Sequence, residues 1–136
     1  MSTAQAVYPD LEGKTVLVSG GASGIGEFMV RAFAAQGAKV GFVDRAQSQG
    51  DRLAALLSSK GHTVEFVCCD ITDEIAYKAA IERFEHSLGP ITVLVNNAAN
   101  DVRHTLEEVD SDTFDKLISV NLKHAFFAAK AVVPMM

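Results

Sequence analysis

The segment from residue 16 to residue 26, Val-Leu-Val-Ser-Gly-Gly-Ala-Ser-Gly-Ile-Gly, constrains the fold of this chain more than any other. A run of β-favouring residues leads into four glycines, and an amphipathic helix pattern follows from Ile25. This order predicts a strand, a tight turn and a helix N-terminus. Backbone N–H groups at a helix N-terminus point at an anion, and the helix dipole favours negative charge there. The segment therefore indicates a pyrophosphate site.

The spacing of the glycines, Gly20-x3-Gly24-x-Gly26, differs from the most common dinucleotide fingerprint. Taken alone, the cluster is equally consistent with a plain turn. Asp44 favours the dinucleotide site, because it ends the next expected strand. A carboxylate at that position can accept hydrogen bonds from the ribose hydroxyls of adenosine.

The composition is that of one globular domain and argues against several classes of partner. With 136 residues, 49% of them hydrophobic, the chain can form a single core. The net charge of −5 argues against a nucleic-acid surface, and no apolar run approaches the roughly 18 residues of a membrane span. The N-terminus lacks the basic start and apolar block of a signal peptide.

The cysteines and histidines predict no further chemistry. Cys68 and Cys69 are adjacent in the sequence, so we expect no disulfide framework and predict a cytoplasmic location. The four histidines have no ligand-like spacing, so we expect no metal site.

Strand and helix patterns alternate along the chain. We expect strands at residues 14–19, 39–43, 63–68 and 91–96, and helices at 24–36, 47–60 and 73–88, the last capped by Thr72. This alternation predicts an α/β fold with a parallel sheet and helices on both faces. Ligands of such sheets bind beyond the carboxyl ends of the strands, and polar or glycine residues stand at those ends here.

A longer helix is expected over residues 112–133, with Ser111 as its N-cap. One face carries an apolar stripe that Asn121 interrupts: Phe114, Leu117, Ile118, Asn121, Leu122, Ala125 and Ala129. A buried amide must be hydrogen-bonded, so Asn121 predicts either a local helix distortion or a proton path near a cofactor. A second apolar strip, Val120, Phe127 and Ala131, favours contact with another layer or another subunit.

Four motifs in this order resemble those of the classical short-chain dehydrogenases/reductases. The glycine motif of that family, Thr-Gly-x-x-x-Gly-x-Gly, corresponds to residues 19–26, with Ser19 in place of threonine. Its Asn-Asn-Ala-Gly corresponds to residues 96–99, where Ala99 replaces glycine and must avoid a positive φ. The other two are Asp70-Ile71, which in the family lies against the adenine, and Val120-Asn121-Leu122.

The resemblance implies a Rossmann-type, doubly wound parallel sheet in a three-layer α/β/α arrangement, with strand order 3-2-1-4. It implies a lead-in at residues 1–10 and an NAD(P)-binding domain at 11–136 that is incomplete at its C-terminal end. It also implies that Asn121 is catalytic and that one set of residues binds the cofactor: Gly20, Ser23, Gly24, Ile25, Gly26, Asp44, Asp70, Ile71, Asn97, Ala98, Ala99 and Val120.

The implied activity is hydride transfer between a nicotinamide cofactor and a secondary alcohol or sugar hydroxyl. Asp44 favours NAD over NADP, because a carboxylate at the ribose diol would repel a 2′-phosphate, although Arg45 next to it can bind one. Residues 97–104, with Asn121-Leu-Lys-His124 after them, resemble the aldose 1-dehydrogenase branch. In that branch Asn100, Asp101, Arg103 and His104 would hydrogen-bond a sugar; the alternative is a solvated loop. The family further implies a dimer or tetramer formed through the long helix.

Two elements of the family's chemistry are missing from these 136 residues: a serine after a fifth strand and a Tyr-x-x-x-Lys motif. Glu12 and Ile81 stand four residues after the two tyrosines, Tyr8 and Tyr77. Because family members reach roughly 250 residues, the resemblance implies the first half of such a protein, with no turnover on its own and with its fourth strand as an open edge.

Two other interpretations remain. The chain can be a non-catalytic dinucleotide-binding module or an inactive fragment, since the cofactor-binding half is the half present. A flavodoxin-like or methyltransferase-like doubly wound domain is the other alternative. The Asn96-Asn97 and Val120-Asn121 motifs count against that second alternative.

Overall fold

The computed structural model of the chain describes residues 6–136, and within them the predicted alternation of strands and helices is confirmed. A short 3₁₀ helix, Pro9–Leu11, comes first. The strands are β1 (Thr15–Ser19), β2 (Lys39–Asp44), β3 (Val64–Cys68) and β4 (Ile91–Val95), and the helices between them are α1 (Gly24–Ala35), α2 (Gln47–Ser59) and α3 (Glu74–Leu88). The strands form one parallel sheet in the predicted order β3-β2-β1-β4.

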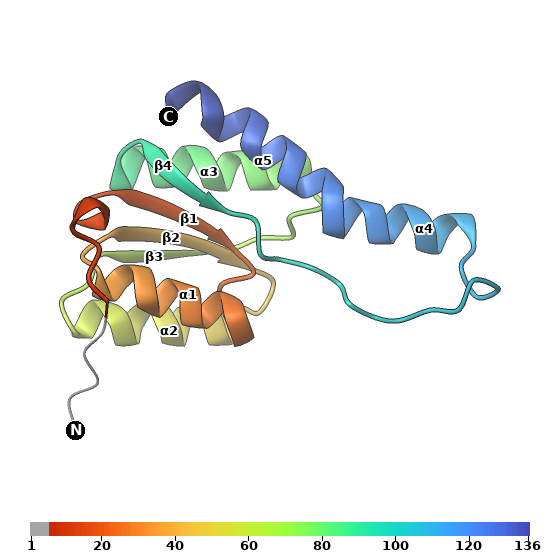
Figure 1. The fold of residues 1–136 in the computed structure, drawn as a ribbon, viewed down its shortest axis with the longest axis horizontal. Coiled ribbons are helices and arrows are strands. Elements are labelled where there is room, and N and C mark those ends of the chain that lie inside the picture. The colour runs from red at the N-terminus through yellow and green to blue at the C-terminus, as the bar shows by residue number, and fades with distance from the viewer. Residues whose placement is uncertain (1–5) are drawn as a thin grey trace.

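The sheet lies between two helical layers (Figure 1). Helices α1 and α2 cover one face, and α3 covers the other together with α5 (His124–Val132). Each face of the sheet carries its own hydrophobic core, and alternate residues of each strand point into one or the other. Val16 and Val18 pack towards α1, whereas Leu17 packs towards α3. The central strands are therefore buried on both faces, as their continuous apolar sequence predicts.

Two helix caps differ from prediction by one residue. Asp73 rather than Thr72 caps α3, through a 3.0 Å bond from the Ala76 N–H to its carboxylate. Asp110 rather than Ser111 caps α4 (Ser111–Ile118), through a 2.8 Å bond from the Thr113 N–H. In both places an aspartate caps the helix in place of the adjacent Thr or Ser. Both residue types can accept the capping hydrogen bond, but the charge of the carboxylate also interacts favourably with the helix dipole.

The predicted helix over residues 112–133 is not continuous. It consists of α4, a π-helical turn (Ser119–Lys123) and α5, followed by a short 3₁₀ turn (Val133–Met135). One extra residue in a turn rotates everything after it by about 100°. The predicted apolar stripe is therefore not one continuous face, and it is wrong as a buried face, because Phe114 and Ile118, which precede this turn, are exposed as well.

The buried side chains of α5 are His124, Ala128 and Val132. Phe114 and Leu122, both from the predicted stripe, are 56% and 61% exposed. Asn121 is also exposed, so it is not a buried amide in the part of the chain that is described. The π-helical turn is, however, the local helix distortion that one interpretation of Asn121 predicted.

The predicted lead-in at residues 1–10 lies partly outside the described residues. Its described part is held by Gln36 at the end of α1: the Tyr8 N–H donates to Oε1 at 2.8 Å, and Nε2 donates to the Ala6 carbonyl at 3.0 Å. The described part of this segment is exposed, and these two hydrogen bonds attach it to the end of α1.

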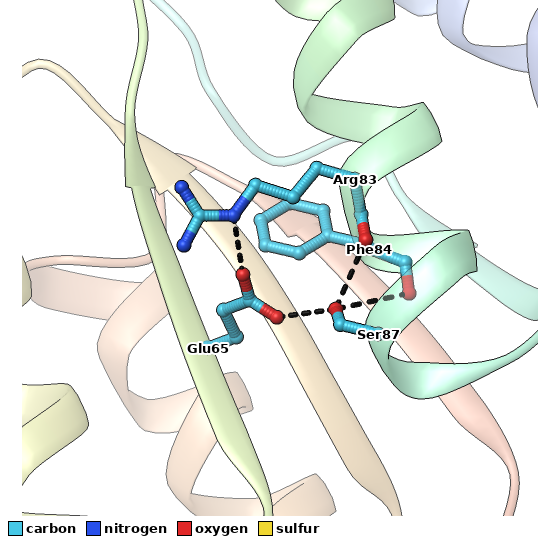
Figure 2. A network of polar contacts seen from close by, with 4 residues as sticks. All are labelled: Glu65, Arg83, Phe84 and Ser87. Carbon is cyan, nitrogen blue, oxygen red and sulfur yellow. Dashed lines mark hydrogen bonds and ion pairs between the residues drawn. The ribbon is translucent and has the colours of Figure 1, made fainter.

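Charged side chains protect one edge of the sheet. Glu65 on the edge strand β3 accepts a 2.6 Å hydrogen bond from Nε of Arg83 and another from the Ser87 hydroxyl, both on α3 (Figure 2). Charge on an edge strand discourages pairing with another chain. The opposite edge, β4, pairs only with β1 among the described strands and remains open, as predicted. None of the described helices is both long and apolar enough to span a bilayer.

Candidate functional site

A cleft of about 700 Å³ lies beyond the carboxyl ends of the strands. It is lined by Gly20, Ser23, Gly24, Ile25, Gly26, Asp44, Arg45, Cys69, Asp70, Ile71, Asn97, Ala98, Ala99, Asn100, Asp101 and Val120. All twelve residues predicted to bind a cofactor are in this set. Segments far apart in the sequence meet here because parallel strands end at the same edge of the sheet.

The glycine turn forms the centre of the cleft. Gly20 and Gly24 have φ of +69° and +55°, a region that other residues adopt only under strain. A Cβ atom at Gly26 would collide with the carbonyl oxygen of Gly20 and lie 2.6 Å from Nδ2 of Asn97. The close packing of α1 against the end of β1 therefore depends on Gly26.

The N-terminus of α1 is open to an anion. Ser23 is its N-cap residue, but the Ser23 side chain makes no capping hydrogen bond. Ser23 is exposed, and a Cβ at Gly24 would meet no atom within 4 Å. The first N–H groups of the helix thus lack intrahelical partners and face accessible space, where an anion can bind them.

Ser19 and Asn97 join the ends of β1 and β4. The buried Ser19 hydroxyl accepts hydrogen bonds from the N–H groups of Asn97 and Ala98, each at 3.1 Å. Nδ2 of Asn97 donates to the carbonyls of Ser19 and Gly20 at 3.0 and 3.1 Å. Asn97 therefore positions the glycine turn, a role that sequence analysis did not assign to it. The sequence feature that could have indicated this role is the hydroxyl residue at position 19, which the Asn97 N–H needs as its acceptor.

Asp44 closes one end of the cleft. Its Oδ2 accepts a hydrogen bond from the N–H of Ala22 in the glycine turn, and its Oδ1 accepts one from the N–H of Ala46, both at 3.0 Å. A carboxylate has about four acceptor positions, so two remain for a ligand. The side chain is half-buried and fixed, and Arg45 beside it is exposed.

Asp70 and Ile71 follow β3 at the same end. Hydrogen bonds from the Thr72 hydroxyl (2.7 Å) and N–H (2.9 Å) to Oδ1 hold the pKa of Asp70 below its usual range. Ile71 is buried. Cys69 also lines the cleft, although the sequence predicted no chemistry for it. Burial, and secondarily Asp70, raises its pKa to about 11, so its thiol is neutral.

The other end of the cleft is formed by residues 98–101 and Val120. Among the described residues only glycines have a positive φ, so Ala99 satisfies the predicted backbone condition. Asn121 does not line the cleft. Its Oδ1 accepts from the Asn100 N–H at 2.7 Å, and its Nδ2 donates to the Asn100 carbonyl at 3.0 Å. Asn121 thus attaches the loop after β4 to the π-helical turn.

The four residues predicted to contact a sugar divide into two pairs. Asn100 and Asp101 line the cleft, whereas Arg103 and His104 do not. Arg103 and His104 are both exposed, and they lie on the loop that extends from β4 to α4 (Figure 1). Within the described residues, no group of three or more His, Cys, Asp or Glu side chains could hold a metal ion.

Comparisons with known proteins match this geometry. The family model for short chain dehydrogenases matches residues 14–136. A Rhizobium meliloti protein named "Probable galactose dehydrogenase GalD" is 42% identical over 137 residues, covering 100% of this chain and 54% of its own length. The D-xylose 1-dehydrogenase of Caulobacter vibrioides is 41% identical over 131 residues, covering 96% of this chain and 51% of its own.

Solved structures agree with the fold. A short-chain dehydrogenase/reductase variant from Serratia marcescens has a TM-score of 0.89 at 30% identity, covering 95% of this chain and 53% of its own. A blue fluorescent protein from a metagenomic library, solved in complex with NADPH, has a TM-score of 0.88 at 33% identity, covering 93% and 52%.

The chain spans about half the length of the curated relatives it matches. The match nevertheless covers the whole sheet and all four motifs on which the resemblance rests. The predicted doubly wound fold and the predicted family are therefore confirmed. By its sequence, its strand order and its structural neighbours, this chain belongs to the short-chain dehydrogenase family.

Proposed function

We propose that this chain forms the cofactor-binding part of an NAD-dependent oxidoreductase that transfers hydride between NAD and an alcohol or sugar hydroxyl. One observation carries the proposal. Twelve residues predicted from motifs line a single cleft that has an open helix N-terminus in its middle and a fixed carboxylate at one end. Bound NAD would supply the hydride acceptor; the residues of this chain bind and orient it.

The proposed binding mode follows the order of residues along the cleft. The N-terminus of α1, from Ser23 to Gly26, holds the pyrophosphate, because its N–H groups are free and Gly24 leaves space beside them. Asp44 accepts hydrogen bonds from the adenosine ribose, and Ile71 contacts the adenine. Residues 97–99 and Val120 contact the nicotinamide end.

We propose a preference for NAD over NADP. Two backbone N–H groups fix the Asp44 carboxylate at the cleft. A 2′-phosphate bound at the ribose would meet this negative charge at short range, and like charges that are partly shielded from water repel strongly. NADPH is the cofactor in one of the similar solved structures, so the test must compare both.

We propose an aldose as the substrate class, oxidised at its C1 hydroxyl. Asn100 and Asp101 line the end of the cleft opposite Asp44, where an amide and a carboxylate can hydrogen-bond sugar hydroxyls. Two curated relatives at 41–42% identity are named as galactose and D-xylose dehydrogenases. Those substrates are theirs, and they define the first sugars to assay.

The described residues contribute binding and positioning rather than the proton acceptor of this reaction. Tyr77 is 2% exposed, burial raises its pKa, and no lysine follows it at the required spacing. Asn121, predicted as catalytic, enters the proposal as the residue that positions Asn100. Because the described residues do not supply that proton acceptor, turnover is measured on the whole protein as it is expressed from its natural gene.

We also propose a homo-oligomer and a cytoplasmic location. Phe127 and Ala131, from the predicted contact strip, line a largely apolar groove of about 600 Å³ between α3 and α5, as does Ile75, which is 85% exposed. Val120, the third residue of the strip, lines the cleft instead. Two adjacent cysteines without a disulfide fit a reducing compartment. Light scattering tests the first point: a dimer or tetramer is expected, and a monomer at micromolar concentration contradicts it.

The decisive experiment is calorimetric titration with NADH and with NADPH, using wild type, Asp44→Asn and Asp51→Asn. Asp51 is a matched control, since it is an exposed carboxylate on α2 that accepts a hydrogen bond from Gln47 and does not line the cleft. We expect tighter binding of NADH, and a loss on the order of tenfold in Asp44→Asn, the size of one charge-assisted hydrogen bond. Tighter binding of NADPH than of NADH would overturn the NAD preference. If the protein binds neither cofactor, the proposed function is wrong.

A separate assay tests the substrate class. If the protein oxidises neither galactose nor xylose with NAD, the sugar assignment is wrong.

A further inference from the structure

Two buried polar side chains behind the cleft each have one atom without a partner. Tyr77 on α3 and His124 at the start of α5 are 2% and 3% exposed. Neither the Tyr77 hydroxyl nor Nε2 of His124 has a hydrogen-bond partner within the described structure. The two ring centroids are 6.5 Å apart. An unsatisfied buried polar atom costs about 1–3 kcal/mol, so two of them close together call for an explanation.

The other nitrogen of His124 contacts the cleft wall. Its Nδ1 lies 2.5 Å from the carbonyl oxygen of Val120. Since a carbonyl only accepts, Nδ1 carries the proton and Nε2 is left as a bare acceptor. Val120 belongs to the π-helical turn and lines the cleft, and Asn121 beside it holds Asn100. His124 therefore connects α5 to this end of the cleft through the Val120 carbonyl.

The Tyr77 hydroxyl is a hydrogen-bond donor, which complements the bare acceptor Nε2 of His124. Burial, and secondarily Cys69, raises the pKa of Tyr77, and the nearby Ser19 hydroxyl opposes this only in small part, so the phenol stays protonated and can donate a hydrogen bond. Ser19 in turn holds the backbone of Asn97 and Ala98. A donor from α3 and an acceptor from α5 thus lie in the same core, between two parts of the cleft wall.

We infer that Tyr77 and His124 are positioning residues of this site: one internal water accepts a hydrogen bond from the Tyr77 hydroxyl and donates one to Nε2 of His124, and this buried polar link fixes the π-helical turn. The link satisfies both orphan atoms. Single-turn π-bulges inside α-helices occur frequently at functional sites, so a contact that fixes this turn also bears on the cleft that it lines. Fixing Val120 also fixes Asn121 and, through it, the loop at Asn100.

The inference rests on the proposed function only for its binding readout. Three variants separate the roles of the two nitrogens and the hydroxyl. Tyr77→Phe removes the donor alone. His124→Leu removes both nitrogens, whereas His124→Asn keeps an N–H that can donate to Val120 in place of Nδ1. Ile81→Val, also on α3 and 2% exposed, is the matched control, because it loses core contacts without touching the link.

Each variant is measured in three ways: NADH affinity, amide hydrogen exchange at Asn100 and over residues 119–123, and melting temperature. We expect Tyr77→Phe and His124→Leu to weaken NADH binding by about tenfold, or about 1.4 kcal/mol. Exchange at Asn100 should be faster in both. His124→Asn should stay nearer wild type than His124→Leu, and Ile81→Val should lower the melting temperature without changing either binding or exchange at Asn100.

A double-mutant cycle gives the sharpest test. If the two atoms form one link, Tyr77→Phe adds little once His124 is leucine, so the two effects on exchange at Asn100 are not additive. Additive effects, or wild-type exchange in Tyr77→Phe, would overturn the link. If wild type fails to bind NADH, the proposed function fails, but the exchange cycle still decides the link. If His124→Leu does not fold, the nearly isosteric Tyr77→Phe alone carries the test.

Discussion

Asn121 and Asn100 form a reciprocal pair, in which the amide of Asn121 bonds both the N–H and the carbonyl of Asn100 at 2.7 and 3.0 Å. The pair joins a π-helical turn to a loop that extends away from the sheet (Figure 1) and is exposed over residues 101–108. The loop after Asn100 therefore depends on this one side chain for its position next to the cleft.

Replacing Asn121 by alanine should release this loop. We expect at least tenfold faster amide exchange at Asn100, because its N–H loses its acceptor, which is worth about 1.4 kcal/mol. Asn100→Ala is the matched control. It keeps the backbone groups that Asn121 uses and loses only the 3.0 Å bond from the Val102 N–H to its own side chain. Equal exchange at position 100 in wild type and Asn121→Ala would show that the pair does not hold the loop.

Ser19 gives a second prediction, on stability. Replacing it by alanine leaves the N–H groups of Asn97 and Ala98 without their shared acceptor in a half-buried place. We expect the free energy of unfolding, measured in urea, to fall by about 2 kcal/mol. Ser19→Thr keeps the hydroxyl and should stay within about 1 kcal/mol of wild type. If both variants lose the same stability, the cost comes from packing around position 19 and not from the hydroxyl.

The cleft was largely predictable from sequence because the features that form it are local. A positive φ at Gly20 and Gly24 and a polar residue such as Asp44 at a strand end are each encoded by one residue and its neighbours. The order of motifs then brings them together, since parallel strands bring their carboxyl ends to one edge. For this reason all twelve predicted residues line one cleft, although their binding role is still a prediction.

What the sequence did not predict depends on single hydrogen bonds or on long-range packing. Asp73 caps α3 in place of the predicted Thr72, whose hydroxyl donates to Asp70 instead. Both residue types can cap a helix, so the sequence alone does not decide between these two neighbours. The π-helical turn differs from an α-helix by one backbone residue, and only Asn121 in an apolar stripe signalled it. The proximity of Tyr77 and His124 has no local signal, because the two residues are far apart in the sequence and only the packing of α3 against α5 brings them together.

His124 also makes the stability of the protein sensitive to pH. Burial lowers its pKa from the usual 6.5, opposed only in part by the bond to Val120. The unfolded chain therefore takes up a proton first as pH falls below about 6.5, so the free energy of unfolding decreases from there down to the folded pKa and then levels off. This loss is the expected sign for a base that is buried in its neutral form.

The measurement is urea unfolding of wild type and His124→Asn at pH 7.5 and pH 5.5. Asparagine does not titrate, so the difference in pH dependence between the two proteins isolates the contribution of His124, while acidic groups such as Asp70 cancel. Wild type should lose more stability than His124→Asn on acidification. The same loss in both would mean that His124 takes up a proton in the folded state as easily as in the unfolded one.

The closest packing in the cleft gives the last prediction. A Cβ at Gly26 would overlap the Gly20 carbonyl and lie 2.6 Å from Nδ2 of Asn97, so Gly26→Ala must push α1 away from β1. We expect loss of NADH binding together with a fall in unfolding free energy of roughly 3 kcal/mol, the range for an overpacked core. Gly61→Ala is the control: at φ +86° and with no atom within 4 Å, it costs about 1–2 kcal/mol through the backbone alone. It lies at the end of α2, away from the cleft, so its NADH affinity should be that of wild type. A Gly26→Ala protein that binds NADH normally would show that α1 can shift without disturbing the anion site.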